Sequence, residues 1–328
     1  MKHLVRAVLF LAVSASIFTF GCRKADDPWV KVPGGPTRIL VTIPPLFCLT
    51  KAVAGDDAAV VCLLGEQGPH GYEPSPNDSL KARGADLLFF VGMDIDDFAS
   101  KIVNASGNRK IELVPVGEKA IPKKMLLAAD PHAHAHEENE KEGGHHHHHH
   151  GEHDPHVWLG VPQAIKMVEF IRDKLQSVNP AKKDAFASNA AAYIKQLRDL
   201  EKHAEKALAG KKNRKFIATH DALRYFAAGF KLNVLDSIQP RPGMEAEAAK
   251  LAKLVTLCEK EGVRVIAVEP QYPRTAAENL VAQLKRKDIT IKTADVDPME
   301  TVPPGDLKPV YYVERMRENI DNLAKALP

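Results

Sequence analysis

Short apolar runs alternate with polar, helix-compatible segments over the first third of the chain. Three of these runs have the length of a strand: TRILVTI (37–43), AAVVCLL (58–64) and DLLFFVG (86–92). Between the last two, SPNDSLKARGA (75–85) offers Ser75 as a helix cap, with a proline at the first helical position. Strands and helices that alternate at this spacing predict a parallel sheet in an α/β lobe.

The pattern changes in the middle of the chain, where residues 161–209 are almost all helix-forming. Asn179-Pro180 interrupts this stretch, and the part that follows, 180–210, predicts a helix about 45 Å long. Its apolar positions recur at threes and fours: Phe186, Tyr193, Leu197, Leu200 and Ala204. We expect this helix to be a rigid strut.

Alternation of apolar and polar segments returns in the last third of the chain. The strand-length runs are KFIAT (215–219), LNVLDS (232–237), VRVIAVE (263–269) and ITIKT (289–293). Helical stretches such as 245–262 separate them. The predicted fold class is therefore α/β, with two parallel-sheet lobes joined by a long rigid helix.

The amino terminus is typical of an export signal. A positively charged start precedes a mostly apolar run from Ala7 to Phe20, which is too short to span a membrane comfortably. Gly21-Cys22 resembles the end of a bacterial lipobox, although Thr19 stands where leucine is usual. We expect an exported chain tethered through a lipid on Cys22; the alternative is ordinary signal cleavage nearby, which leaves Cys22 lost or free.

These patterns divide the chain into five parts. They are a signal peptide (1–21), a lipid-proximal tether (22–36), an N-terminal α/β lobe (37–178), a linking helix (179–210) and a C-terminal α/β lobe (211–328). The first lobe contains a low-complexity insertion at 130–154, for which the lack of apolar periodicity predicts disorder.

Charge and cysteine content exclude some classes of function. The formal net charge of +3 is too near zero for a surface that binds nucleic acid. Apart from Cys22, the scattered Cys48, Cys62 and Cys258 form neither a zinc ribbon nor a disulfide framework. A bridge between Cys48 and Cys62 and a pair of buried thiols both remain open.

The insertion concentrates metal-binding side chains. Its histidines are His132, His134, His136, His145, His146, His147, His148, His149, His150 and His153. Carboxylates surround them and Lys141 is the one base, so the segment suits a divalent cation better than an anion. Three interpretations are open: an accessory loop that collects or buffers metal, a dispensable spacer, or a cloned tag, which the internal position disfavours.

Four further candidate ligands follow predicted strands or lie near the lobe boundary. They are His70, His156, His220 and Asp297. Ligands of open parallel sheets bind beyond the carboxyl ends of the strands. Each residue alone fits an ordinary turn or cap, but three imidazoles and one carboxylate drawn from both lobes form a zinc donor set.

These residues lie in motifs that resemble a known family. GPHGYEPSPND, DPHVWL, THDALRYFAAGF, VEPQY and the Asp-Pro turn at Asp297 resemble, in order, the zinc/manganese solute-binding lipoproteins of bacterial ABC metal-uptake systems. The resemblance covers residues 37 to 325 and includes the long helix and the insertion. It implies metal ligands at His70, His156, His220 and Asp297. One departure is Gly160-Val161-Pro162 after DPHVWL, where Asp-Pro is frequent.

The resemblance also implies a function, partners and a location. Three histidines favour Zn²⁺ as the transported ion over the manganese-preferring members, which carry a carboxylate in place of His220. The implied protein is a periplasmic or cell-envelope lipoprotein and a monomer. It binds zinc without being an enzyme and serves an ABC permease. The open alternatives are a stand-alone zinc or nickel buffer and, less favoured, a zinc hydrolase.

The fourth ligand and the surrounding side chains are less defined. Glu269 or water competes with Asp297 for the fourth position. Asp154, Glu73 and Asp221 are candidates for accepting hydrogen bonds from metal-bound imidazoles, which normally donate their second N–H. Trp158 and Tyr72 suit either a cleft wall or core packing.

Overall fold

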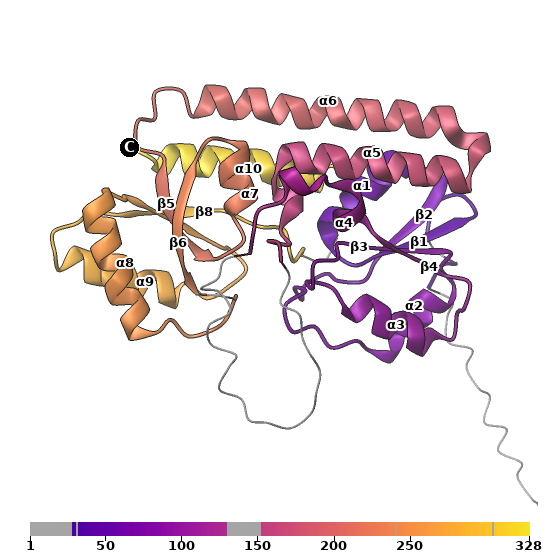
Figure 1. The fold of residues 1–328 in the computed structure, drawn as a ribbon, viewed down its shortest axis with the longest axis horizontal. Coiled ribbons are helices and arrows are strands. Elements are labelled where there is room, and N and C mark those ends of the chain that lie inside the picture. Colours follow the sequence, from indigo (N-terminus) through magenta and orange to yellow (C-terminus); the bar gives the residue numbers. More distant parts are fainter. Residues whose placement is uncertain (1–27, 31, 130–151, 240, 304) are drawn as a thin grey trace, which may run out of the picture.

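The computed structural model describes residues 28–30, 32–129, 152–239, 241–303 and 305–328 (Figure 1). The first lobe and its helices comprise β1 (Thr37–Val41), α1 (Pro44–Ala54), β2 (Ala58–Cys62), α2 (Pro76–Arg83), β3 (Leu87–Phe90), α3 (Phe98–Ser106), β4 (Glu112–Pro115), α4 (Val116–Ala120), η1 (Lys123–Met125), η3 (Val157–Leu159) and α5 (Val161–Val178). The connecting elements are η4 (Pro180–Lys182) and α6 (Lys183–Ala207). The second lobe comprises β5 (Lys215–His220), α7 (Arg224–Gly229), β6 (Asn233–Gln239), α8 (Ala248–Glu261), β7 (Val265–Val268), α9 (Thr275–Lys285), β8 (Lys292–Asp295) and α10 (Tyr311–Ala326).

Each lobe is built on one parallel four-stranded sheet. The strand orders are β2-β1-β3-β4 and β6-β5-β7-β8. In the first sheet Ile39 of β1 lies opposite Val60 and Leu87 of its two neighbours, and β5 has the same central place in the second sheet. The predicted α/β class with two parallel sheets is thus confirmed.

The edge strands are where the sequence pattern predicts least well. β4 was not expected at all, and β8 begins at Lys292, three residues later than the apolar run at 289–293 suggested. Both strands lie at the edge of a sheet and expose part of their side chains. An edge strand needs no continuous apolar run, so its signal in the sequence is weak.

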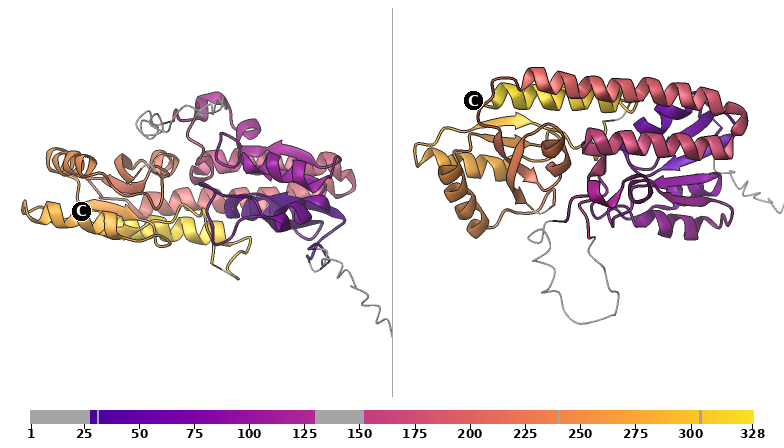
Figure 2. Two further views of the ribbon diagram at one scale, coloured as in Figure 1. Left: turned by 90° about the horizontal axis from the view of Figure 1, so that it is seen from below. Right: turned by 45° about the horizontal axis from the view of Figure 1, so that its top comes forward.

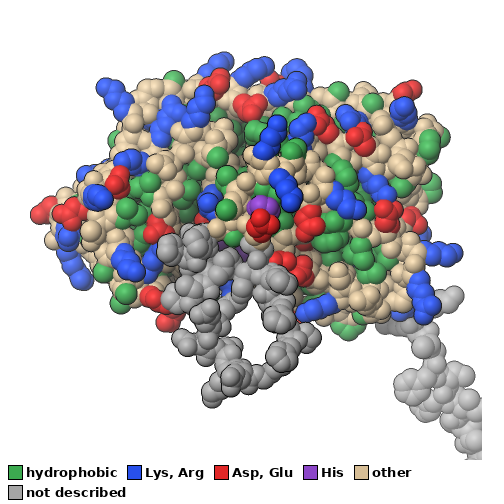
Figure 3. Space-filling view, viewed as in Figure 1, with side chains coloured by type: hydrophobic (Ala, Val, Ile, Leu, Met, Phe, Trp, Pro, Cys, Tyr) green, Lys and Arg blue, Asp and Glu red, His purple; other side chains and the backbone are tan. Residues whose placement is uncertain are grey.

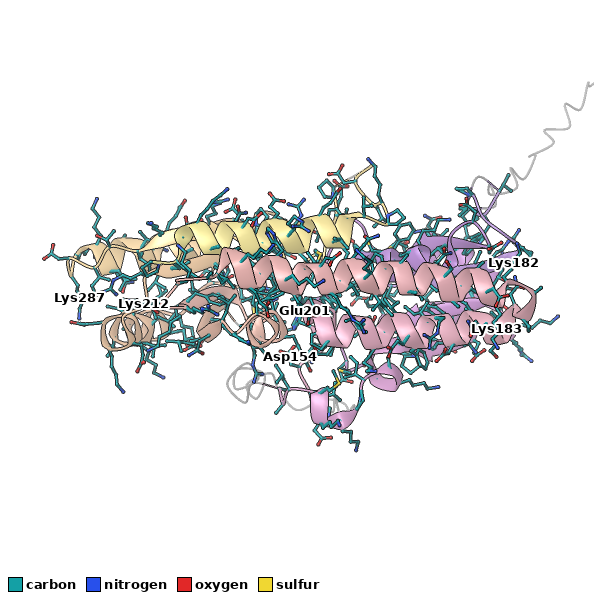
Figure 4. All side chains as sticks on the ribbon, turned by 90° about the horizontal axis from the view of Figure 1, so that it is seen from above. Asp154, Lys182, Lys183, Glu201, Lys212 and Lys287 are labelled. Atoms are coloured by element: carbon teal, nitrogen blue, oxygen red, sulfur yellow. The ribbon has the colours of Figure 1, made fainter. Side chains whose placement is uncertain are left out.

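Helix α6 connects the lobes along their length. It packs against α5, α10 and α1, and the views in Figure 2 agree that α6 and α10 run side by side. At its first end the ammonium of Lys182 lies 2.6 Å from a carboxylate oxygen of Asp57. Figure 4 shows Lys182 and Lys183 at that end and Lys212 beyond the other. The predicted long helix is therefore present, preceded by one 3-10 turn.

One hydrophobic core extends across both lobes. It contains Ile39 of the first sheet, Leu197 of α6 and Phe216 of the second sheet. Because side chains alternate along a strand, Ile217 points to the opposite face, where a smaller core lies against α8 and α9. The shared core leaves little freedom for the lobes to move independently.

The cysteines of the described residues are single thiols. Cys48, Cys62 and Cys258 are free, which decides the open alternative against a bridge between Cys48 and Cys62. Burial raises the pKa of Cys48 to about 12 and that of Cys258 to about 11, so both thiols stay protonated at neutral pH. Cys22 lies outside the described residues. No described helix is both long and apolar enough to cross a bilayer.

The shared core predicts that metal binding changes the overall shape little. Small-angle X-ray scattering of metal-free and metal-loaded protein should give nearly equal radii of gyration, because α6 and the common core bind the lobes together. A decrease on loading as large as that of a hinge closing between two domains would contradict this expectation.

Candidate metal centre

Four ionisable side chains from separate parts of the chain meet between the lobes. His70 lies in the loop after β2, His156 immediately precedes η3, His220 ends β5, and Glu300 lies in the loop after β8. Their ligand atoms all lie within 4.8 Å of one another. Figure 3 shows histidine and acidic side chains at the junction of the lobes. The structure thus brings together the three predicted histidines, beyond the carboxyl ends of the strands.

The distances from one Glu300 oxygen to the three imidazole nitrogens match the edges of a tetrahedral ligand set. Oε1 of Glu300 lies 3.2 Å from Nε2 of His70, 3.1 Å from that of His156 and 3.4 Å from that of His220. Four ligands about 2.05 Å from a zinc ion at tetrahedral angles are separated from one another by about 3.3 Å. The three oxygen–nitrogen distances therefore fit a zinc site, and all four ligand atoms lie within 4.8 Å of one another.

The hydrogen bonding at the centre also favours a cation. Within the described residues, Nε2 of His156, Nε2 of His220 and Oε2 of Glu300 are buried without a hydrogen-bond partner. The two nitrogens are close to Oε1 of Glu300, but not at angles suited to a hydrogen bond. Unpartnered buried polar atoms are rare and destabilising, and a metal ion would satisfy these lone pairs together.

The other ring nitrogens of two histidines are held by carboxylates. Oδ1 of Asp154 lies 2.9 Å from Nδ1 of His156 and accepts a second hydrogen bond from its backbone N–H at 3.0 Å. Glu269, considered above as a ligand, lies beside Nδ1 of His220 instead. These contacts leave each Nε2 facing the centre, which is the arrangement that orients metal-binding imidazoles.

His70 is positioned by the loop that carries it. The hydroxyl of Tyr72 donates to Asp78 at 2.7 Å, and the same carboxylate accepts from the backbone N–H and hydroxyl of Ser75. Tyr72 therefore ties this loop to the first turn of α2. His70 has a side chain 21% exposed, whereas the other three are buried, so an ion reaches the centre past His70.

Asp297 does not join the four-residue cluster, which differs from the sequence prediction. Its Oδ1 accepts from the backbone N–H of Met299 at 2.7 Å, and its Oδ2 accepts from the hydroxyl of Tyr311 at 3.2 Å and lies 3.3 Å from Nε of Arg315. These bonds fix the loop after β8. Met299 adopts a left-handed conformation (φ 63°) within it, next to Glu300.

The sequence contained a signal for Glu300 that could have been used. DVDPME places two carboxylates three residues apart after one strand, and either could face the cleft. The choice between them depends on the turn at Met299 and on the partners of Asp297 from α10. Neither is readable from one sequence.

Opposite charges shift the pKa values of this cluster. Burial alone would lower the pKa of His156, but the carboxylates of Asp154 and Glu300 raise it to about 9. His220 likewise has its pKa raised well above the ordinary value by Glu269 and Glu300, against the effect of burial. Burial would raise the pKa of Glu300, yet the histidines hold it well below its usual range.

The ends of the histidine-rich insertion are fixed beside the centre. Ala128 and His153 form an antiparallel bridge, and the N–H of Asp154 donates to Leu127 at 2.9 Å. From α7, Arg224 donates to the carbonyl of Ala128 at 2.6 Å. His153 therefore belongs to the stem of the insertion. The other predicted accessory histidines (His132, His134, His136 and His145 to His150) lie outside the described residues.

Comparisons of the sequence agree with this geometry. The model of the family described as zinc-uptake complex component A, periplasmic, matches residues 39–326. The zinc-binding lipoprotein AdcA of Streptococcus pneumoniae is 32% identical over 96% of this chain, which spans only 60% of that relative's length. The high-affinity zinc uptake system protein ZnuA of Bacillus subtilis is 28% identical, with 98% of this chain and 96% of that protein aligned.

Solved structures show the same fold. The Zn(II)-bound ZnuA-like domain of S. pneumoniae AdcA matches with a TM-score of 0.69 at 29% identity, over 89% of this chain and 99% of that one. The solute-binding protein FpvC of Pseudomonas aeruginosa, in complex with Mn²⁺, matches with a TM-score of 0.75 at 26% identity, over 89% and 98% of the two chains. Similar structures therefore hold more than one metal.

The raised pKa values predict proton release on metal binding. At pH 7.5 the imidazole of His156, with its pKa raised to about 9, is positively charged in the metal-free protein, so metal binding through its Nε2 should release at least about one proton per ion. Calorimetric titrations in buffers of different ionisation enthalpy measure this number. A value near zero would contradict the charge arrangement.

The same shifts set how stability depends on pH. The pKa of His156 in the folded protein lies above the unfolded value near 6.5. Its contribution to the free energy of unfolding is therefore fully present below about pH 6.5 and is lost as the pH rises through about 9. The melting temperature of metal-free protein should therefore fall across this interval, while the gain on adding metal grows. Equal gains at pH 6.5 and 9 would oppose this interpretation.

The choice between the two carboxylates of the loop after β8 is testable. Glu300→Gln should weaken metal binding strongly, because it removes the charged oxygen at the centre. Asp297→Asn keeps a similar shape and should mainly lower the melting temperature, since Asp297 bonds the loop and α10. Competition titration and thermal melts of both variants measure these effects; a larger affinity loss in Asp297→Asn would return the ligand role to Asp297.

Proposed function

This chain belongs to the family of zinc-uptake complex component A periplasmic proteins, and on that premise we propose that it captures Zn²⁺ outside the cytoplasmic membrane for uptake. The ion would be held between the lobes by Nε2 of His70, His156 and His220 and by a carboxylate oxygen of Glu300. Zinc is the cargo of such a protein, and delivery to an ABC permease is its task.

The observation that carries this proposal is the meeting of three imidazole nitrogens and one carboxylate oxygen within 4.8 Å of one another. Imidazole suits zinc, whereas manganese favours more oxygen ligands and a larger coordination number, so this donor set favours zinc over the manganese-preferring alternative. Four protein ligands also leave no open position for a reactive water, which disfavours a zinc hydrolase.

The location and partners are proposed on the same premise. The family description is periplasmic, and the relative from S. pneumoniae is named a lipoprotein. We therefore propose an envelope protein anchored through a lipid on Cys22, which acts as a monomer and docks on the permease of a zinc uptake system. The nearly unchanged shape expected on loading implies that release follows a local change in ligand geometry.

The histidine-rich insertion is proposed to collect or buffer zinc beside the cleft. A dense set of imidazoles and carboxylates raises the local concentration of bound metal, but ordering such a segment costs entropy. Each arrangement of its ligands should thus bind more weakly than the centre. The stem at Ala128 and His153 keeps this segment within reach of the centre.

A zinc titration against a strong chelator tests the proposal. The protein used would begin after Cys22 and lack residues 130–151, while Glu152 to Asp154 are kept because they form the stem. We expect one tight equivalent of zinc. His220→Ala should weaken it by more than about 100-fold, beyond the loss usual for residues that only orient a ligand.

A surface histidine provides the matched control. His203 of α6 pairs with Asp321 at 2.6 Å, away from the cluster, so His203→Ala should leave zinc affinity unchanged. If His203→Ala and His220→Ala behaved alike, the proposed centre would not be the binding site. If the shortened protein bound no tight equivalent, the insertion would be the binding element. The protein would then be a stand-alone zinc or nickel buffer.

A further inference from the structure

Trp158 connects the two chain segments that carry His156 and Glu300. Its side chain is fully buried in the 3-10 turn η3, two residues after His156. The indole N–H donates to the carbonyl of Pro298 at 2.8 Å, and Pro298 lies two residues before Glu300. A single side chain thus spans the junction between two ligands that are far apart in the sequence.

The indole ring also contacts one ligand directly. The rings of Trp158 and His156 have centroids 5.3 Å apart and planes inclined at 61°. This edge contact restricts the imidazole on one side, while Asp154 holds its Nδ1 on the other. The direction of Nε2 of His156 therefore depends on both neighbours.

The loop of Glu300 is restrained on both sides of the ligand. Before it, Pro298 accepts from Trp158; after it, the N–H of Val302 donates to the carbonyl of Gly65 at 2.8 Å. Trp158 and Gly65 both precede α6 in the chain, so the part of the molecule that carries His70 and His156 holds this loop. Such restraint is needed because the left-handed Met299 is a costly conformation.

Trp158 is itself held from the second lobe. The hydroxyl of Tyr312, in α10, donates to the backbone carbonyl of Trp158, and Tyr312 is fully buried. The backbone of Trp158 is thus held by α10, while its indole is held by the carbonyl of Pro298.

We propose that Trp158 is a positioning residue that couples His156 to Glu300 and thereby slows the dissociation of the bound metal. This inference rests on the proposed metal centre. The indole contributes no ligand atom; it acts by fixing the relative positions of two ligands. Loss of its N–H lets the Glu300 loop move and leaves the ion with three firmly held donors.

The test is the substitution Trp158→Phe in the full mature chain, with Zn²⁺ as the probe. Phenylalanine keeps an aromatic ring and removes the N–H. We expect the dissociation constant to rise by about 10-fold, the lower end of the range for residues that orient metal ligands, mostly through faster dissociation. Competition titration gives the affinity, and stopped-flow transfer to a chelator gives the rate.

The other tryptophan of the chain is the matched control. Trp29 is also buried (4% exposed) and donates its indole N–H to the carbonyl of Lys81 at 2.9 Å, but it lies on the first lobe beside Gly84, away from the centre. Trp29→Phe should leave both affinity and rate unchanged. Equal behaviour of Trp29→Phe and Trp158→Phe would overturn the proposal.

A double-mutant cycle separates positioning from general damage to the core. If Trp158 acts through Glu300, then Trp158→Phe should weaken binding clearly less in a Glu300→Gln background than in the unmodified chain. An effect of the same size in both backgrounds would overturn the proposal. The Co²⁺ absorption spectrum adds a further readout, because Trp158→Phe should alter the ligand field and Trp29→Phe should not.

Two further measurements keep the outcome interpretable. Thermal melts without metal show whether Trp158→Phe folds. If it does not, Tyr312→Phe is measured instead; it removes the hydrogen bond to the Trp158 carbonyl and should also accelerate the dissociation of zinc. No acceleration would overturn the proposal. If His220→Ala and Glu300→Gln also leave zinc binding intact, the proposed metal centre is wrong. If those two variants weaken binding but Trp158→Phe does not, only the proposed coupling through Trp158 is wrong.

Discussion

The centre of the structure depends on three imidazoles, two of them buried, that surround one carboxylate oxygen. Nε2 of His70, His156 and His220 all lie within 3.4 Å of the same oxygen of Glu300, in a site largely removed from water. Without a cation, the lone pairs at this point have too few hydrogen-bond donors, and protons on the imidazoles are the substitute. A metal ion and protons therefore compete for the same nitrogen atoms, so that metal binding releases protons and protonation releases the metal.

The rest of the fold holds these four groups at fixed separation. The loops and strand ends that carry the four groups meet between the two sheets, while α6 and a core common to both lobes prevent the lobes from separating. Bonds that cross the cleft add to this rigidity. Trp158 reaches the loop of Glu300, and Arg224 reaches the stem of the insertion. A preformed site avoids the cost of assembling ligands at each binding event.

The proposed function rests on the rigid connection between the lobes and on the nitrogen and oxygen atoms that meet at the centre. Three imidazoles and one carboxylate that meet at one point suit the binding of a metal ion, which agrees with the family to which the chain belongs. Of the four side chains at the centre, only that of His70 is partly exposed to solvent. The stem of the histidine-rich insertion ends at Asp154, which lies two residues before His156 and contacts its Nδ1.

The sequence alone determined the elements whose evidence is local or periodic. It predicted the parallel α/β lobes from apolar runs, the long helix from spacing at threes and fours, and the three histidines from their place after strands and within family motifs. The sequence pattern missed edge strand β4 and placed the start of edge strand β8 too early, because the half-exposed residues of these strands lack a continuous apolar run. The identity of the fourth residue at the centre, a carboxylate, was decided only by tertiary structure. Asp297 and Glu300 share one short motif, and contacts from α10, Trp158 and the left-handed Met299 determine which of them faces the histidines.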